Sequence, residues 1–198
     1  MRPARQRLTP AATALVAVFC GLVVTGCATQ NESASREYLD ERTAATVTVA
    51  GGGLVFARAR PEYAVSARDY LTLVPVDVNR AGTHVLYFYG YVWSTIDKPA
   101  GSEALAQFEL IADGRRIPLA PSAAAPRALG FGDPPVKLPA RDARTLIVVT
   151  SREVLQFLVR AQELSALGTR DGLGERYDLW DDGRSAIEEF LHGGAAGR

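Results

Sequence analysis

The chain has few of the residues that most often carry catalysis or bind metals. Its 198 residues include two cysteines, two histidines and one methionine. The histidines, His84 and His192, lie in no recognisable motif, so neither a metal site nor a histidine-based triad has support. The motifs G-x-S-x-G, S-x-x-K and H-E-x-x-H are also absent from the sequence. We therefore predict no catalytic residues, no metal and no cofactor.

Long apolar runs are scarce as well. The main one extends from Ala11 to Val24, and its 14 residues would form a helix of roughly 21 Å, shorter than the roughly 30 Å hydrocarbon core of a bilayer. It follows a segment that holds Arg2, Arg5 and Arg7 and no acidic residue. This order is typical of a secretory signal peptide, which we predict over residues 1–26. A permanent transmembrane helix is the less favoured interpretation.

The apolar run ends at Val24-Thr25-Gly26-Cys27, and polar residues follow at once. This segment resembles the lipobox of bacterial lipoproteins, in which a small residue precedes a cysteine that becomes lipidated and N-terminal. The resemblance implies that cleavage separates Gly26 from Cys27 and that the Cys27 thiol carries a diacylglyceryl group. It also implies a further fatty acyl chain, such as palmitate, on the new amino terminus. A signal peptide without a lipid is the alternative.

The lipoprotein resemblance also implies a location. Two or more acyl chains anchor a protein stably, whereas one chain gives only marginal binding. The residue that follows the cysteine is Ala28 and not an aspartate. In enterobacterial-type sorting this pattern directs a lipoprotein to the outer membrane. We therefore expect a protein that is anchored in the outer membrane and faces the periplasm.

The chain that would remain after cleavage has no free thiol and no excess of positive charge. Cys20 would leave with the leader and Cys27 would be alkylated, which excludes disulfides, thiolate catalysis and cysteine-bound metals. The leader holds three of the 22 basic residues and none of the 22 acidic ones, so the remainder has a formal net charge of −3. This charge argues against a nucleic-acid partner and against electrostatic binding to anionic lipid.

The remaining residues are enough for one domain with a hydrophobic core. Residues 28–36 are small and polar, so we predict a lipid anchor and flexible tether over residues 27–37 and one globular domain over residues 38–198. Alternating apolar and β-branched residues predict a mainly β fold, an antiparallel β-sandwich of about seven strands over residues 44–150. The predicted strands are 46–49, 54–60, 70–78, 84–96, 104–111, 117–119 and 146–150.

Three local signals refine this prediction. Pro75 lies within the strand 70–78 and lacks the N–H group that a ladder needs, so it predicts a sheet edge or a bulge at that point. Asp113-Gly114 is the pair that favours a two-residue hairpin turn. The triplet Gly51-Gly52-Gly53 predicts a turn, because no lysine and serine follow it as a phosphate-binding loop requires.

The predicted strand 84–96 carries a row of aromatic residues. Tyr87, Tyr89, Tyr91 and Trp93 alternate and therefore share one face, while apolar residues also occupy the other face. This pattern predicts a central strand between two layers. An aromatic row can also stack a ligand, so these four residues and Phe131, in the long connection that follows, are candidate binding residues. Core packing is the more ordinary role for such a row.

The last quarter of the chain predicts an α+β addition, a helix, a hairpin and a second helix over residues 151–193. Thr150 to Glu153 fits a capping box at the start of the first helix, which we expect to end near Leu164. Asp181 or Asp182 would cap the second helix. The acidic residues around this cap lack the spacing of a calcium loop, so we predict no metal there. Three residues of the second helix should face inward, namely Ile187, Phe190 and Leu191.

Two functional classes are compatible with these features. The favoured one is a binding or assembly module that presents a surface to an envelope protein, to peptidoglycan or to a small ligand. The alternative is a hydrolase of envelope polymers, which would need two carboxylates close together, one with a raised pKa. A concave site with convergent charged groups would favour the enzyme, whereas a closed sandwich with a smooth apolar patch would favour the module.

Overall fold

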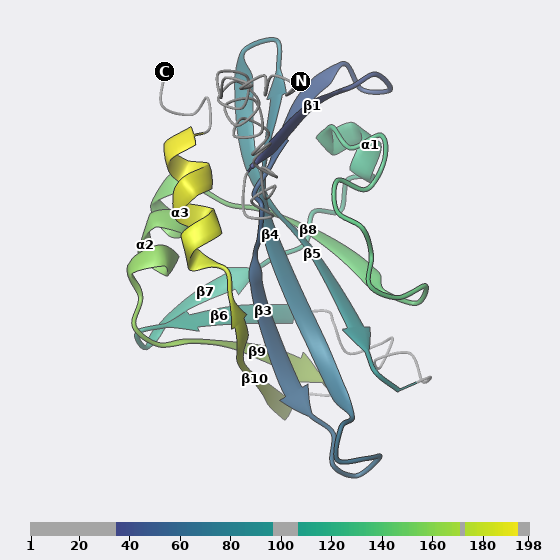
Figure 1. Ribbon diagram of the computed structural model, residues 1–198, viewed down its shortest axis with the longest axis vertical. Helices are drawn as coiled ribbons and strands as arrows, with labels where there is room; N and C mark the ends of the chain where they lie inside the picture. Colours follow the sequence, from purple (N-terminus) through teal and green to yellow (C-terminus); the bar gives the residue numbers. More distant parts are fainter. Residues whose placement is uncertain (1–34, 97–106, 171–172, 194–198) are drawn as a thin grey trace, which may run out of the picture. The chain divides into compact units, whose positions relative to one another are not determined.

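The computed structural model describes residues 35–96, 107–170 and 173–193. The predicted signal peptide, Cys27 and the first part of the predicted tether lie outside the described residues, as do the first three residues of the predicted strand 104–111. The described chain contains ten strands and three helices (Figure 1). Among the described residues, none of these helices has both the length and the apolar character needed to pass through a bilayer.

The strands are β1 (Arg36–Asp40), β2 (Ala45–Val49), β3 (Leu54–Ala59), β4 (Arg68–Arg80), β5 (Thr83–Ser94), β6 (Gln107–Ala112), β7 (Arg115–Leu119), β8 (Arg144–Val149), β9 (Leu164–Arg170) and β10 (Leu173–Asp182). The helices are α1 (Pro126–Leu129), α2 (Arg152–Arg160) and α3 (Arg184–Gly193).

The fold is mainly β and antiparallel, with small helices near the C-terminus, as the sequence predicted. All ten strands belong to one continuous sheet in the order β1-β2-β4-β3-β10-β9-β6-β7, while β5 pairs with β4 and β8. The sheet exceeds the predicted count of about seven for two reasons. The chain enters it at Arg36, two residues before the predicted start of the domain, and the C-terminal hairpin β9–β10 pairs with β6 and β3.

β4 is the central strand of the sheet, and Pro75 marks a change of partner along it. On one side β4 pairs with β5 along its whole length. On the other side its first half pairs with β3 and its second half with β2, and Pro75 falls between the two ladders. A residue without an N–H group fits there because neither ladder requires it as a donor. The prediction of a sheet edge or a bulge at Pro75 is therefore wrong, because β4 is a central strand and its pairing with β5 continues through Pro75 without a register shift.

Tight hairpins set the register of the sheet. β6 and β7 are joined by Asp113-Gly114, and both residues have positive φ, 47° for Asp113 and 78° for Gly114. That geometry gives the two-residue turn its twist and favours glycine at the second position. The predicted hairpin is therefore confirmed.

The sheet curls until its last strands approach each other. Pro121, two residues beyond the end of β7, forms an isolated bridge with Val148 of β8, and the Ser122 N–H donates to the Ile147 carbonyl at 2.7 Å. Pro118 lies in β7, which pairs with one neighbour only, and a proline at such an edge discourages pairing with other chains. The curled sheet thus has two opposed halves that enclose apolar side chains, as a sandwich does.

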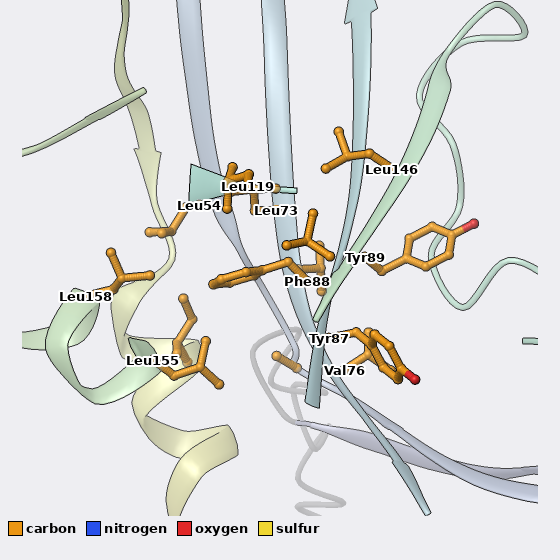
Figure 2. Packing of buried hydrophobic residues seen from close by; sticks show 14 of the residues in the cluster. Leu54, Leu73, Val76, Tyr87, Phe88, Tyr89, Leu119, Leu146, Leu155 and Leu158 are labelled. Atoms are coloured by element: carbon orange, nitrogen blue, oxygen red, sulfur yellow. The ribbon is translucent and has the colours of Figure 1, made fainter. Parts of the chain in front are cut away.

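The core lies on the face of β4 and β5 that we call the inner face, which carries Leu73 and Phe88. Both are at most 1% exposed, and Figure 2 shows Phe88 pointing to the same side as Leu155 and Leu158 of α2. Leu119 of β7 joins the same buried cluster. The opposite face, which we call the outer face, carries the aromatic row of β5. The outer face is buried at Tyr87 and Tyr89, as expected of a strand between two layers, whereas Trp93 further along the same face is only partly buried.

The two helices of the C-terminal addition form where they were predicted, but the first one is shorter, and the hairpin between them belongs to the sheet. Ser151 caps α2 by accepting from the Val154 N–H at 3.3 Å. The helix ends at Arg160, earlier than predicted, because Ala161 turns to an extended conformation and Leu164 opens β9. The N–H of Arg184 at the start of α3 donates to Asp182 at 3.2 Å. The three predicted inward residues of α3 are buried, namely Ile187, Phe190 and Leu191.

Candidate functional site

The first half of the aromatic row is covered by the connection between β7 and β8. Tyr87 and Tyr89 are at most 5% exposed, and the ring of Phe131 meets each of them edge to face at 5.5 Å between centroids. Figure 2 shows Tyr87 and Tyr89 on the side of β5 opposite Phe88. Burial raises the pKa of both tyrosines above its usual value. These three candidate residues thus come together, and they fill a second apolar layer.

A buried carboxylate fastens this connection to the sheet. Asp40, at the end of β1, accepts the N–H of Gly132 at 2.6 Å and those of Arg42 and Thr43 at 3.0 and 3.2 Å. Burial alone would raise the pKa of Asp40, but these donors outweigh it and hold the pKa below its usual value. Arg36 adds a hydrogen bond to the Pro135 carbonyl at 2.6 Å. The connection is therefore held by polar contacts at both ends of β1.

The second half of the row leads to an aromatic surface. Tyr70 of β4 and Trp93 of β5 face each other across the two strands, and their rings stack at 4.3 Å with an interplanar angle of 11°. The ring of Trp180 in β10 meets Tyr70 edge to face at 6.2 Å. The Arg68 guanidinium lies over the Trp180 ring at 4.9 Å from its centroid. We call these four residues the aromatic shelf.

Trp180 reaches the shelf because of a β-bulge. The pairing between β10 and β3 shifts register between Leu179 and Asp181, so Trp180 is the extra residue on its strand. A bulge turns a side chain out of the regular alternation and commonly lies next to a functional site. Trp180 is 58% exposed, which is unusual for so large an aromatic side chain.

A cleft of about 460 Å³ adjoins the shelf on the same face. Its floor is a row of three paired residues, Val55 of β3, Thr72 of β4 and Tyr91 of β5. The shelf residues Tyr70 and Trp93 lie two positions further along β4 and β5, which is about 7 Å at the rise of a strand. Cleft and shelf therefore form one continuous surface.

The walls of the cleft combine bare backbone with charged groups. The segment 51–53, which joins β2 to β3, forms one wall. β2 and β3 follow each other in the same direction along one side of β4, so the chain does not reverse here and the predicted turn at Gly51-Gly52-Gly53 is wrong. A side chain at Gly53 could not be accommodated, because its Cβ would lie 2.3 Å from the Leu73 carbonyl oxygen. The charged residues of the lining are Arg36, Lys137 and Asp181. A site of this kind offers stacking surface, hydrogen-bond donors and one carboxylate to a polar ligand.

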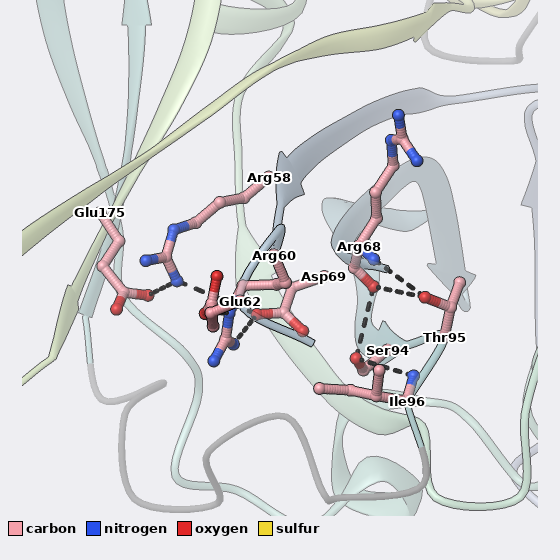
Figure 3. Close-up of polar contacts among 9 residues, drawn as sticks. All are labelled: Arg58, Arg60, Glu62, Arg68, Asp69, Ser94, Thr95, Ile96 and Glu175. Carbon is pink, nitrogen blue, oxygen red and sulfur yellow. Dashed lines mark hydrogen bonds and ion pairs between the residues drawn. The ribbon is translucent and has the colours of Figure 1, made fainter. Parts of the chain in front are cut away.

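A second polar cluster lies where the chain passes from the end of β3 to the start of β4 (Figure 3). The buried Asp69 carboxylate contacts Arg60 at 2.5 Å, and Arg60 also pairs with Glu62 at 2.5 Å. Arg58 pairs with Glu175 of β10 at 2.7 Å and lies 4.0 Å from Asp69. Every carboxylate of this cluster thus has an arginine partner.

These pairings bear on the hydrolase alternative. The hydrogen bond from Arg60 lowers the pKa of Glu62, and the bond from Arg184 lowers that of Asp182. A general acid needs the opposite shift, which comes from burial without a cationic partner. The described lining of the cleft supplies a single carboxylate, Asp181, whereas glycoside hydrolysis uses two. The cleft is concave and charged, as expected of an enzyme, but this arrangement does not favour acid–base hydrolysis.

The two histidines and the acidic residues near α3 have local partners. The His84 ring lies 2.7 Å from the Asp77 carboxylate, and His192 contacts the Glu188 carbonyl at 2.8 Å. Asp178 pairs with Arg176 at 2.9 Å. Within the part of the chain that the structure describes, no three histidine, cysteine or carboxylate side chains gather as a metal site would need.

The sequence identified part of this site. Trp93 and Tyr91, both predicted candidates, lie on the shelf and in the cleft, whereas Cys27 lies outside the described residues. Tyr70, Trp180 and Lys137 were not predicted, because they come from segments far apart in the chain and meet through strand pairing. The Trp-Asp-Asp segment 180–182 carried the one available signal, an aromatic residue next to acidic ones at a strand end.

Comparison with known proteins adds no family to these observations. No family model matches the chain, and neither the curated proteins nor the solved structures contain a match.

Proposed function

We propose that the protein is a lipid-anchored binding module of the bacterial cell envelope. Cys27 carries the lipid, and the module faces the periplasm from the outer membrane. The lipobox-like segment before Cys27 supports the anchor, and Ala28 supports the outer-membrane location. The cleft and the aromatic shelf are the binding surface of the module.

The observation that carries this proposal is the pairing of a ligand-sized cleft with the only two tryptophans of the chain. Small-molecule sites commonly measure about 300–1,000 Å³ and combine aromatic surface with a few placed polar groups. Trp93 and Trp180 supply the aromatic surface, and Lys137 and Asp181 supply charged groups of both signs. A tryptophan held in solvent at a bulge is better explained by binding than by packing.

Fractionation of cells tests the anchor. Cys27→Ala removes the acylated atom, so the variant should lose fatty-acid labelling and should no longer be processed to the lipidated form that resides in the membrane fraction. Cys20→Ala, in the leader, is the matched control and should be labelled like the wild type. Equal fatty-acid labelling of the wild type and Cys27→Ala would contradict the proposal.

Capture from cross-linked envelopes tests the binding role. The wild type should be retained with an envelope component, and Trp180→Ala should be retained less while its abundance in the membrane stays the same. Tyr63→Ala removes another exposed aromatic residue and should behave as the wild type. A wild type that is released freely from cross-linked envelopes would contradict a binding role.

A further inference from the structure

We infer that the cleft and the aromatic shelf bind a saccharide chain that carries carboxylate groups. This inference rests on the proposed function, because it names the ligand class of the same surface. Size, aromatic chemistry and charge each lead to it.

The size of the surface suits a chain of sugar rings better than a protein. A stable protein interface buries about 800 Å² on each partner around a core of apolar anchors. Among the residues of the cleft and shelf, Trp180 is the one large hydrophobic side chain that is mostly exposed. The cleft of about 460 Å³ continues into the shelf about 7 Å further along the strands, so the surface is elongated. A linear ligand can occupy both parts at once.

The shelf has the chemistry that a sugar ring recognises. The face of an aromatic ring is electron-rich, whereas the C–H groups on one face of a pyranose are weakly positive and apolar, so the two attract each other. Trp180 is exposed at the bulge, with Arg68 over its ring. Tyr70 and Trp93 lie beside it and are only partly buried. The stack of Tyr70 on Trp93 fixes both rings before a ligand arrives, which reduces the entropy lost on binding.

The charges of the cleft select an acidic ligand. Two cationic residues, Arg36 and Lys137, and one carboxylate, Asp181, line it. Lys137 is exposed, and among the described residues it forms no ion pair. An ammonium group in this position attracts a carboxylate of the ligand, and the Asp181 oxygens can accept from sugar hydroxyl groups. This local excess of positive charge occurs on a chain whose net charge after cleavage is −3.

Tryptophan fluorescence of the full chain in detergent micelles gives a direct assay, because Trp93 and Trp180 are the only tryptophans. The probes are peptide-free peptidoglycan strands, which carry lactyl carboxylates, and chito-oligosaccharides of similar length, which have the N-acetylated backbone without them. The acidic strands should change the emission in a saturable way and bind at least tenfold more tightly than the neutral ones. Unchanged emission with both probes would overturn the inference.

Variants separate the contribution of aromatic stacking from the contribution of charge. Trp180→Ala should weaken binding of the acidic strands at least tenfold, with Trp93 as the remaining reporter, whereas Trp180→Phe should retain most of the affinity. Lys137→Gln should remove most of the preference for the acidic probe and leave the neutral one unaffected. Tyr63→Ala is the control with unchanged affinities. Equal affinity of the wild type and Trp180→Ala would place the saccharide elsewhere and overturn the inference.

The same experiment distinguishes failure of this inference from failure of the proposed function. If neither saccharide binds while the wild type is still captured with an envelope protein in a Trp180-dependent way, the surface binds a protein. The inferred ligand class is then wrong and the binding module stands. If capture from envelopes fails as well, both are wrong.

Discussion

Phe131→Ala tests whether the first half of the aromatic row is a structural layer. Phe131 is 2% exposed and lies against Tyr87 and Tyr89, each at 5.5 Å between ring centroids. Truncation of a buried phenylalanine costs about 3–5 kcal/mol, and edge-to-face pairs account for about 0.5–1.5 kcal/mol each beyond burial. Because a domain has about 5–15 kcal/mol of total stability, the loss is large.

The assay is chemical and thermal denaturation of the chain that begins at Ala28. At about 2–4 °C for each kcal/mol in a domain of this size, a loss of about 3–5 kcal/mol lowers the melting temperature by roughly 6–20 °C. Phe131→Leu keeps an apolar side chain of similar volume and should lose less than half as much. Hydrogen exchange of β1 and β8 shows whether the connection alone detaches. A Phe131→Ala variant with unchanged melting temperature and unchanged protection of these strands would refute the claim that this half of the aromatic row is a structural layer.

Two further changes test the contacts that hold the fold together. Asp40→Asn replaces an acceptor of three N–H groups and should cost about 1–3 kcal/mol at pH 7. Because the folded pKa of Asp40 is lowered, its contribution is present above the unfolded value of about 3.9 and disappears as the pH falls through the folded pKa, so denaturation of the two proteins should converge in acid. Phe190→Asp places a charge at a 3% exposed position of α3 and should lower stability by several kcal/mol, whereas the exposed Glu188→Lys should change it by about 0.5 kcal/mol at most. Equal stability of Asp40→Asn and the wild type at pH 7, or rapid proteolysis of wild-type α3 while the rest stays folded, would contradict these assignments.

Most of the strands and the turn between β6 and β7 could be predicted because their signals are local. Alternation along β5, the Asp113-Gly114 turn and the apolar stripe of α3 each depend on residues within one element. The course of the sheet depends on pairings between distant segments, such as β10 with β3, and a single sequence does not specify them. For that reason the C-terminal hairpin was predicted as part of an addition to the sandwich, whereas its two strands belong to the sheet itself.

In the candidate site, too, the features with local signals were predicted and those that depend on long-range pairing were not. Alternation placed Tyr91 and Trp93 on one face of β5, and both contribute to the site. It also suggested Tyr87 and Tyr89 as binding residues, because a strand pattern does not show which part of a face a distant connection will cover. Trp180 depends on a bulge, and a bulge results from the register of two strands that are about 120 residues apart, as their pairing shows.

Site-specific photo-cross-linking in living cells tests the central claim most directly, namely that this face of a lipid-anchored module binds an envelope component. A photoreactive amino acid with an aromatic ring, which keeps a stacking surface as Trp180→Phe does, replaces Trp180 in one variant and the exposed Glu188 of α3 in the other. The account predicts a light-dependent adduct, either retained with the peptidoglycan or shifted in mass by a protein, from position 180 and none from position 188. No adduct from position 180, or the same adduct from both positions, would contradict it.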